Sequence, residues 1–130
     1  FATSGINVGL FCSTPSVPVS RNLGRKQAME LLLTGHFIDA HTALQWGLVN
    51  RVVPASRLDQ EVAELAGSIM SKSWVAVATG KRMFYKQLEL PLESAYDYAS
   101  GVMAGNMMAD DVEEGVDAFM QKRTPVWKHQ

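Results

Sequence analysis

Few side chains in this 130-residue chain could act as a nucleophile or bind a metal ion. Cys12 is the single cysteine, and no histidine lies near it in the sequence to activate its thiol, so we expect a small apolar role for it. The histidines are His36, His41 and His129, and the first two lie five positions apart across an expected turn. That is not the spacing of a helical ligand pair. The sequence therefore predicts neither a nucleophilic cysteine nor a metal site.

The remaining candidates are charged residues at the two ends of one expected helix. Its first turn is acidic and contains Asp110, Asp111, Glu113 and Glu114. Negative charge is favourable there because it faces unpaired N–H groups, and the group lacks the spacing of a calcium-binding loop. Lys122 and Arg123 lie near the end of the helix, where positive charge suits the helix dipole. The helix by itself thus explains both groups.

A helix-rich chain must position these residues. Apolar side chains recur at spacings of three and four, and glycine, proline and capping residues interrupt them. The pattern predicts helices at 15–23, 25–34, 40–46, 56–72, 74–88, 92–108 and from 110 or 111 to about 123. Residues 48–53, closed by Pro54, are predicted as a β-strand, and a second short strand is expected within 1–10.

The composition is that of one globular unit in an aqueous, reducing compartment. Hydrophobic residues make up 47% of the chain, and the net charge of -1 gives no general attraction to nucleic acid or an anionic membrane. Charged residues interrupt every apolar run before the roughly 20 residues that a membrane span needs. The single cysteine fits the cytoplasm, or the mitochondrial matrix in a eukaryote. Because the chain opens on Phe1 without a signal-peptide pattern, we expect a processed, truncated or partly observed protein.

Three segments of the sequence resemble one family. The run AMELLLTGHFIDAHTALQWGLVNRVVPASRL resembles the crotonases, the relatives of enoyl-CoA hydratase and isomerase, in its order of helix, Leu-Thr-Gly, short helix, Gly-Leu-Val, strand and Val-Pro. The closing EEGVDAFMQKRTPVWKH resembles the same family. The opening FATSGINVGLFCSTP resembles its enoyl-CoA hydratase domain-containing subgroup. The resemblance covers essentially the whole chain.

This resemblance implies the C-terminal half of an α/β crotonase fold, which is a ββα superhelix followed by helices. The 130 residues of this chain would be mainly α, with one or two short strands. Residues 1–54 would form the C-terminal end of the crotonase core. Residues 55–130 would form a helical region for oligomerisation and coenzyme A contact, within one continuous unit.

The resemblance also implies chemistry on acyl-CoA thioesters. The family polarises the thioester carbonyl with two backbone N–H groups, an oxyanion hole that stabilises an enolate, and the hydratases add two glutamates. The oxyanion donors and one glutamate would lie upstream of this chain. The second glutamate would fall in a Pro-Glu-Ile-x-x-Gly motif, whose place is taken by Ser4-Gly5-Ile6-Asn7-Val8-Gly9.

Gly5 can neither accept nor donate a catalytic proton, so we assign no catalytic residue in this chain. The 130 residues alone are expected to be inactive, and whether the whole protein is an enzyme stays open at this point. The alternative is a non-catalytic module for oligomerisation or acyl-CoA binding, either a pseudoenzyme or a fragment.

Lys122 and Phe119 are the ligand contacts that the resemblance implies. Lys122 would contact the adenine-nucleotide phosphates of coenzyme A, and Phe119 would line the acyl or pantetheine channel, often of a neighbouring subunit. Helix-end charge remains the structural alternative for Lys122. The implied ligand is a coenzyme A thioester as substrate, without a covalently bound cofactor. The implied assembly is a homo-oligomer, either a trimer or a pair of trimers.

Overall fold

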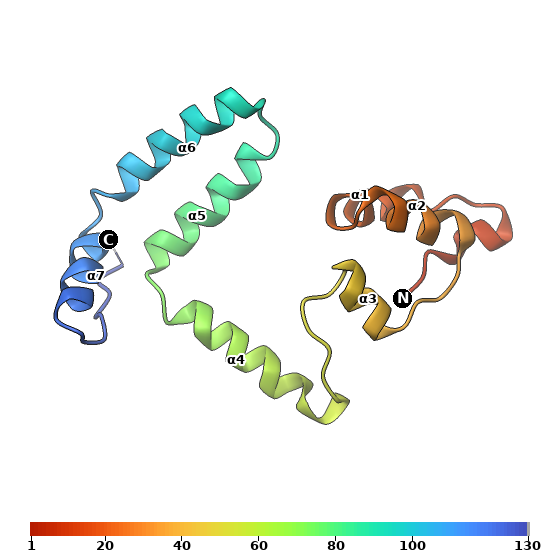
Figure 1. The fold of residues 1–130 in the computed structure, drawn as a ribbon, viewed down its shortest axis with the longest axis horizontal. Helices are drawn as coiled ribbons and strands as arrows, with labels where there is room; N and C mark the ends of the chain where they lie inside the picture. The colour runs from red at the N-terminus through yellow and green to blue at the C-terminus, as the bar shows by residue number, and fades with distance from the viewer. Residues whose placement is uncertain (130) are drawn as a thin grey trace. The chain divides into compact units, whose positions relative to one another are not determined.

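The structure is a computed structural model that describes residues 1–129. Figure 1 shows a chain of helices joined by short connections. The chain divides into two compact units, Phe1–Leu58 and Asp59–Gln130. None of the helices in the described part of the chain is long and apolar enough to cross a membrane.

The first unit is built around helix α2. Its elements are η1 (Ser4–Val8), α1 (Ser13–Asn22), α2 (Arg25–Thr34), α3 (Ala40–Trp46) and η2 (Ala55–Arg57). Its core consists of Leu23, Ala28 and Leu31, with Val19, Ile38, Trp46 and Leu48 packed against them. The start of the chain is fixed to this core, because Phe1 and Ile38 exchange two backbone hydrogen bonds of 2.9 Å. The hydroxyl of Thr3 donates to the carbonyl of Leu31 at 2.7 Å.

The ends of α3 follow the capping signals in the sequence. The carboxylate of Asp39 accepts a hydrogen bond from the backbone N–H of Thr42 at 2.7 Å. This bond holds the pKa of Asp39 below its ordinary value. Gly47 ends the helix in the left-handed region, with φ 83°. The helix predicted at 40–46 is confirmed.

The two predicted strands do not form in the described residues. Residues 48–53 lack helix or strand structure, and the N–H groups of Leu48 and Val49 turn back to the carbonyl of Ala43. At the start of the chain, Ser4–Val8 forms a 3-10 helix in place of a strand. A β-strand needs a neighbouring strand to complete its hydrogen bonds, and residues 1–129 offer none. The strand predictions are wrong for this structure.

Up to residue 129, the second unit contains four helices in series. They are α4 (Leu58–Met70, beginning at the last residue of the first unit), α5 (Trp74–Gln87), α6 (Leu92–Asn106) and α7 (Asp110–Met120). Figure 1 shows α5 and α6 side by side and antiparallel. Ser73 caps α5 by accepting a hydrogen bond from the N–H of Ala76 at 3.2 Å. The predicted helices agree with these four to within a few residues at their ends.

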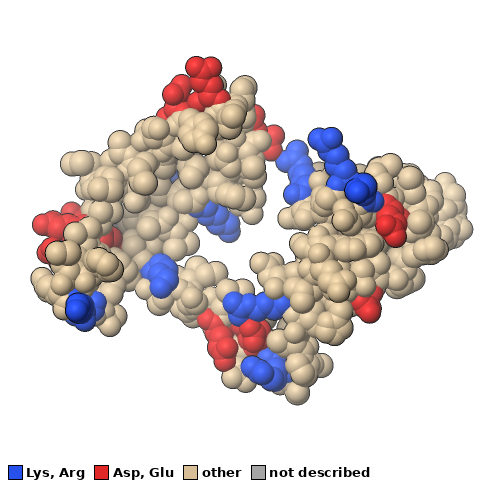
Figure 2. Space-filling view, viewed as in Figure 1, with Lys and Arg blue, Asp and Glu red and all other residues tan. Residues whose placement is uncertain are grey.

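Much of the apolar surface of the second unit is open. Helices α4 and α5 contain no buried residue. The periodic apolar side chains of α4 are exposed, namely Leu58, Val62, Leu65 and Ile69. Figure 2 shows that uncharged surface covers most of the visible face of α5 and α6, with acidic side chains gathered where one helix turns into the other. The apolar stripes read from the sequence therefore exist, and within this unit they are uncovered.

Candidate functional site

Lys122 lies in the turn that follows α7. The N–H of Arg123 donates to the carbonyl of Ala118 at 3.0 Å, and the N–H of Lys122 donates to that of Phe119 at 3.2 Å. This pair of bonds is the Schellman ending of a helix. The backbone of Lys122 has φ 55°, the left-handed conformation that glycine usually supplies in this motif. For an L-residue this conformation costs roughly 1–2 kcal/mol.

The same end of α7 presents an open apolar surface. Ala118 is buried, while Phe119 is 81% exposed. Val116 and Met120 are exposed as well, so α7 packs through one side and leaves the other side free. The structure thus places the aromatic ring of Phe119 and the ammonium group of Lys122 within one turn of chain at the end of one helix.

Arg123 and Lys122 differ in their surroundings, although they are neighbours. The guanidinium group of Arg123 donates two hydrogen bonds to the carboxylate of Glu114, at 2.6 and 2.8 Å. Glu114 also accepts a bond from the N–H of Val126 at 2.7 Å. The bonds from Arg123 and then Val126 lower the pKa of Glu114 to about 2. Lys122, in contrast, is exposed and forms no ion pair with any residue of the described chain.

Asp111 fixes the chain that follows this turn. Its carboxylate accepts a bond from the hydroxyl of Ser73 at 2.5 Å, from the N–H of Lys128 at 2.7 Å and from the N–H of His129 at 3.1 Å. Asp111 is only 3% exposed. Burial raises the pKa of its carboxyl, but these hydrogen bonds outweigh that effect and hold the pKa below its ordinary value.

Two further contacts, one of the indole of Trp127 and one of the imidazole of His129, hold the same segment in place. The indole N–H of Trp127 donates to the carbonyl of Ser71 at 2.8 Å, and its ring lies against Gly115. The N–H of Trp74 donates to Nδ1 of His129 at 3.1 Å. We call residues 124–129 the tail. The tail clamp is our name for the carboxylates of Asp111 and Glu114 together with their hydrogen bonds to Arg123 and to the tail.

The sequence did not reveal the tail clamp. The acidic residues at the start of α7 are predicted to serve the helix dipole, yet Asp111 and Glu114 bind groups beyond the other end of the helix. The residue at the N-cap position is Ala109, which makes no capping bond. The sequence does show acidic residues on α7 followed by Arg123 and the tail. Their spacing alone does not indicate which of these groups form hydrogen bonds with one another.

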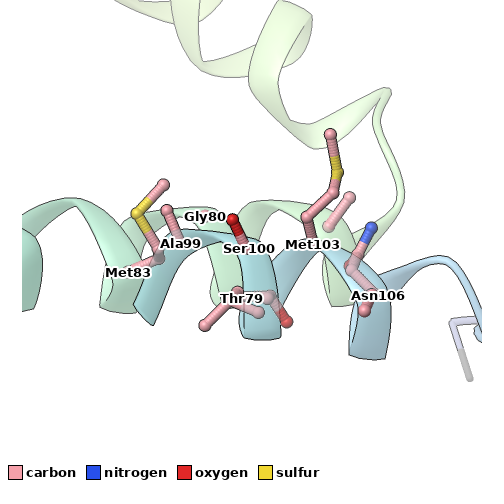
Figure 3. A pocket seen from close by; sticks show the side chains of 10 residues that line it. Thr79, Gly80, Met83, Ala99, Ser100, Met103 and Asn106 are labelled. Carbon is pink, nitrogen blue, oxygen red and sulfur yellow. The ribbon is translucent and has the colours of Figure 1, made fainter. Parts of the chain in front are cut away.

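A groove lies between α5 and α6. Its volume is about 620 Å³, and its lining is mostly apolar. Figure 3 shows side chains from both helices around it, among them Thr79, Met83, Ser100 and Met103. The side-chain Oδ1 of Asn106 is buried without a hydrogen-bond partner in the described residues. Met103 on α6, and Met107 and Met108 directly after this helix, are exposed.

Position 5 has no room for a side chain. A Cβ atom built on Gly5 would lie 2.8 Å from Sγ of Cys12 and 2.8 Å from the carbonyl oxygen of Leu10. Cys12 itself is half-buried. Within the described residues, no group of three or more histidine, cysteine, aspartate or glutamate side chains could hold a metal ion.

Comparison with known families and curated proteins gives consistent matches. The family model described as "Enoyl-CoA hydratase/isomerase" matches residues 1–130. The mitochondrial enoyl-CoA hydratase domain-containing protein 3 of Rattus norvegicus is 50% identical over 129 residues, which are 99% of this chain and 43% of the rat protein. Carnitinyl-CoA dehydratase of Salmonella typhi is 39% identical over 103 residues, 76% of this chain and 40% of that protein.

Solved structures match over nearly the whole chain. An enoyl-CoA hydratase from Mycobacterium smegmatis is 54% identical with a TM-score of 0.94, covering 98% of this chain and 49% of that one. Human enoyl Coenzyme A hydratase domain-containing protein 3 is 49% identical with a TM-score of 0.91, covering 98% and 50%. The chain thus spans about half the length of the relatives that it matches.

Proposed function

The chain belongs to the enoyl-CoA hydratase/isomerase family, and we propose that it is the coenzyme A-contacting C-terminal part of an enzyme that acts on acyl-CoA thioesters. Its fold is the helical part of the crotonase fold. The relatives' names support a thioester substrate, since carnitinyl-CoA dehydratase is named for one.

The end of α7 is the observation that carries this proposal. An acyl-CoA combines apolar groups with several phosphates, so its site needs an apolar surface beside a cation. The exposed ring of Phe119 supplies the first and Lys122, exposed and without an ion pair in the described chain, supplies the second. A lysine ammonium group suits phosphate as a point charge. We propose that Lys122 contacts the nucleotide phosphates and Phe119 the acyl or pantetheine portion.

In this proposal the chain supplies binding, and the reacting groups lie elsewhere in the protein. As the family resemblance implies, the two N–H groups of the oxyanion hole that stabilises an enolate would lie outside this chain, and Gly5 brings no carboxylate. The 130-residue chain alone should therefore not hydrate crotonyl-CoA. Mass spectrometry of the product tests this, and a robust rate that depends on the added chain would contradict it.

Gly5 also favours the second candidate, a protein that binds acyl-CoA or assembles without catalysis. The missing carboxylate is a departure from the two-glutamate pattern of hydratases. Turnover by the protein at its natural length separates the two candidates. Any acyl-CoA product, whether by hydration or isomerisation, supports the enzyme, and binding without product supports the non-catalytic module.

We further propose a homo-oligomer, because the exposed apolar faces of the second unit need a cover. The family resemblance implies a trimer or a pair of trimers. The names of the rat and mouse relatives include the word mitochondrial. We propose the mitochondrial matrix as the location if the protein comes from a eukaryote, and the cytoplasm otherwise.

Substitution of Lys122 tests the coenzyme A site. Lys122→Glu replaces attraction with repulsion and should weaken binding of coenzyme A, and added salt should reduce the difference by screening. Calorimetric titration at two ionic strengths measures both effects. Lys81→Glu is the matched control, because Lys81 is an exposed lysine on α5.

A lysine that serves only the helix dipole would behave otherwise. Its reversal would lower the free energy of unfolding by roughly 0.3–1 kcal/mol and leave the affinity of the folded protein unchanged. Equal affinities of the wild type and Lys122→Glu, with both proteins folded, would remove Lys122 from the site.

A further inference from the structure

The turn that contains Lys122 is held from both sides by groups that do not touch its side chain. On one side, α7 ends in the Schellman bonds from Lys122 and Arg123. On the other side, the tail clamp binds Arg123, Val126 and the end of the tail. We propose that Glu114 and Asp111 are positioning residues that hold Lys122 in the conformation that meets coenzyme A, an inference that rests on the proposed function.

Glu114 closes the turn directly. One of its oxygen atoms accepts bonds from both Arg123 and the N–H of Val126, at 2.6 and 2.7 Å, and the other accepts from Arg123 at 2.8 Å. Arg123 is the residue after Lys122, and Val126 lies three residues further on. A bidentate arginine–carboxylate pair fixes orientation as well as distance. The residues after Lys122 are therefore tied back to Glu114, near the start of α7.

Asp111 extends the same restraint to the end of the tail. It is buried, and its carboxylate joins the N–H groups of Lys128 and His129 to the hydroxyl of Ser73 at the start of α5. The indole of Trp127 adds a bond to Ser71 in the same region. The tail thus has fixed points on α7 and at the connection before α5.

The backbone conformation of Lys122 explains why this restraint is needed. Its φ of 55° is disfavoured for a lysine, so the free chain would favour other conformations at this residue. A disfavoured conformation persists where the surroundings determine it. The bonds of the tail clamp are such surroundings, and they set the direction in which the Lys122 side chain leaves the chain.

A double-mutant cycle tests whether Glu114 acts through Lys122. The protein is used at its natural length, and calorimetry measures the affinity for coenzyme A of the wild type, Glu114→Gln, Lys122→Ala and the double variant. Glu114→Gln keeps the size of the side chain but loses the charge that holds Arg123. Glu113→Gln is the matched control, since Glu113 is the exposed neighbour on the same helix.

If Glu114 positions Lys122, Glu114→Gln should weaken binding about 3- to 10-fold in the wild-type background, which is within the range of interaction energies between neighbouring residues. In the Lys122→Ala background it should change affinity by less than about twofold, because the group that it positions is gone. The loss of affinity caused by Glu114→Gln should also be smaller at high salt, because salt screens the contact between Lys122 and phosphate. Glu113→Gln should leave affinity unchanged.

A purely structural role gives a different pattern. Equal losses in both backgrounds, or no loss in a folded Glu114→Gln protein, would overturn the inference while a weakened Lys122→Ala protein still supports the proposed site. An unchanged Lys122→Ala protein would remove the proposed site and this inference together. If Glu114→Gln folds poorly, Arg123→Lys replaces it, because lysine keeps the charge but cannot form the bidentate pair, and the same outcomes apply.

Discussion

At Gly5, even a single added Cβ atom would lie too close to its neighbours. The carbonyl oxygen of Leu10 and the thiol of Cys12 both lie 2.8 Å from the place of a Cβ atom. The thiol could rotate away, whereas the backbone carbonyl is held, since the N–H of Leu10 donates to the carbonyl of Gly5 at 3.0 Å. A carboxylate cannot be restored at this position without moving the backbone.

Gly5→Ala should therefore destabilise the protein by about 1–3 kcal/mol, as overpacking does elsewhere. Thermal or denaturant unfolding of the natural-length protein measures the change. Gly67→Ala is the control, because Gly67 lies in α4 with nothing within 4 Å of its added Cβ. That change should stabilise the protein by roughly 0.5–1 kcal/mol. A Gly5→Ala protein as stable as the wild type would show that the loop moves freely.

Residues with local roles are predictable from the sequence, and residues with distant partners are not. The roles of Asp39 and Gly47 at the two ends of α3 follow from local sequence, because a cap and its N–H group are three residues apart. Asp111 takes its bonds from residues 17, 18 and 38 positions away. Pattern and charge show an acidic residue there, and the fold determines its partners.

The helices themselves were predictable for the same reason, and the strands were not. Each helix satisfies its backbone within itself, so apolar spacing and end signals suffice to place it. The segment 48–53 has the composition of a strand, but a strand depends on a second segment that the described chain lacks. Of the candidate site, Lys122 and Phe119 came from family resemblance, and their roles stay predictions.

At the scale of elements, Ser73 joins two helices. Its hydroxyl oxygen accepts the capping bond from Ala76 at the start of α5, and the same hydroxyl donates to Asp111 on α7. Ser73→Ala should lower the free energy of unfolding by about 0.5–2 kcal/mol from the lost cap alone. Chemical denaturation measures it. Ser71→Ala, which removes an exposed hydroxyl bonded to Ser68, should have a much smaller effect; equal effects would contradict the link.

The ion pair between Glu114 and Arg123 predicts that the free energy of unfolding depends on pH. The pKa of Glu114 in the folded chain is about 2, below its ordinary value of 4.5, so the charged form stabilises the fold. This contribution is complete above pH 4.5 and is lost as the pH falls through 2. The free energies of unfolding of the wild type and Glu114→Gln should therefore differ near neutral pH and become equal in acid. Unfolding experiments at a series of pH values measure this. A difference between wild type and Glu114→Gln that stays constant over this pH range would contradict the prediction.

At the scale of the whole molecule, the open apolar faces predict association. Val62 and Leu65 lie on the exposed stripe of α4, and stripes of this kind usually mark interfaces. Sedimentation of the natural-length protein should show a closed homo-oligomer at micromolar concentration. Val62→Glu should shift it toward smaller species, and Glu64→Gln, on the same helix, should not. A stable, well-folded wild-type monomer would refute this.

The attachment of the tail has a consequence for hydrogen exchange. Segments without helix or strand structure usually open easily, and their amide protons exchange with solvent quickly. Here the amides of Lys128 and His129 donate to a buried carboxylate. Their deuterium uptake should be slow and should report opening of the last segment of the chain, whereas Asp111→Asn should bring it close to the rate of an unfolded peptide.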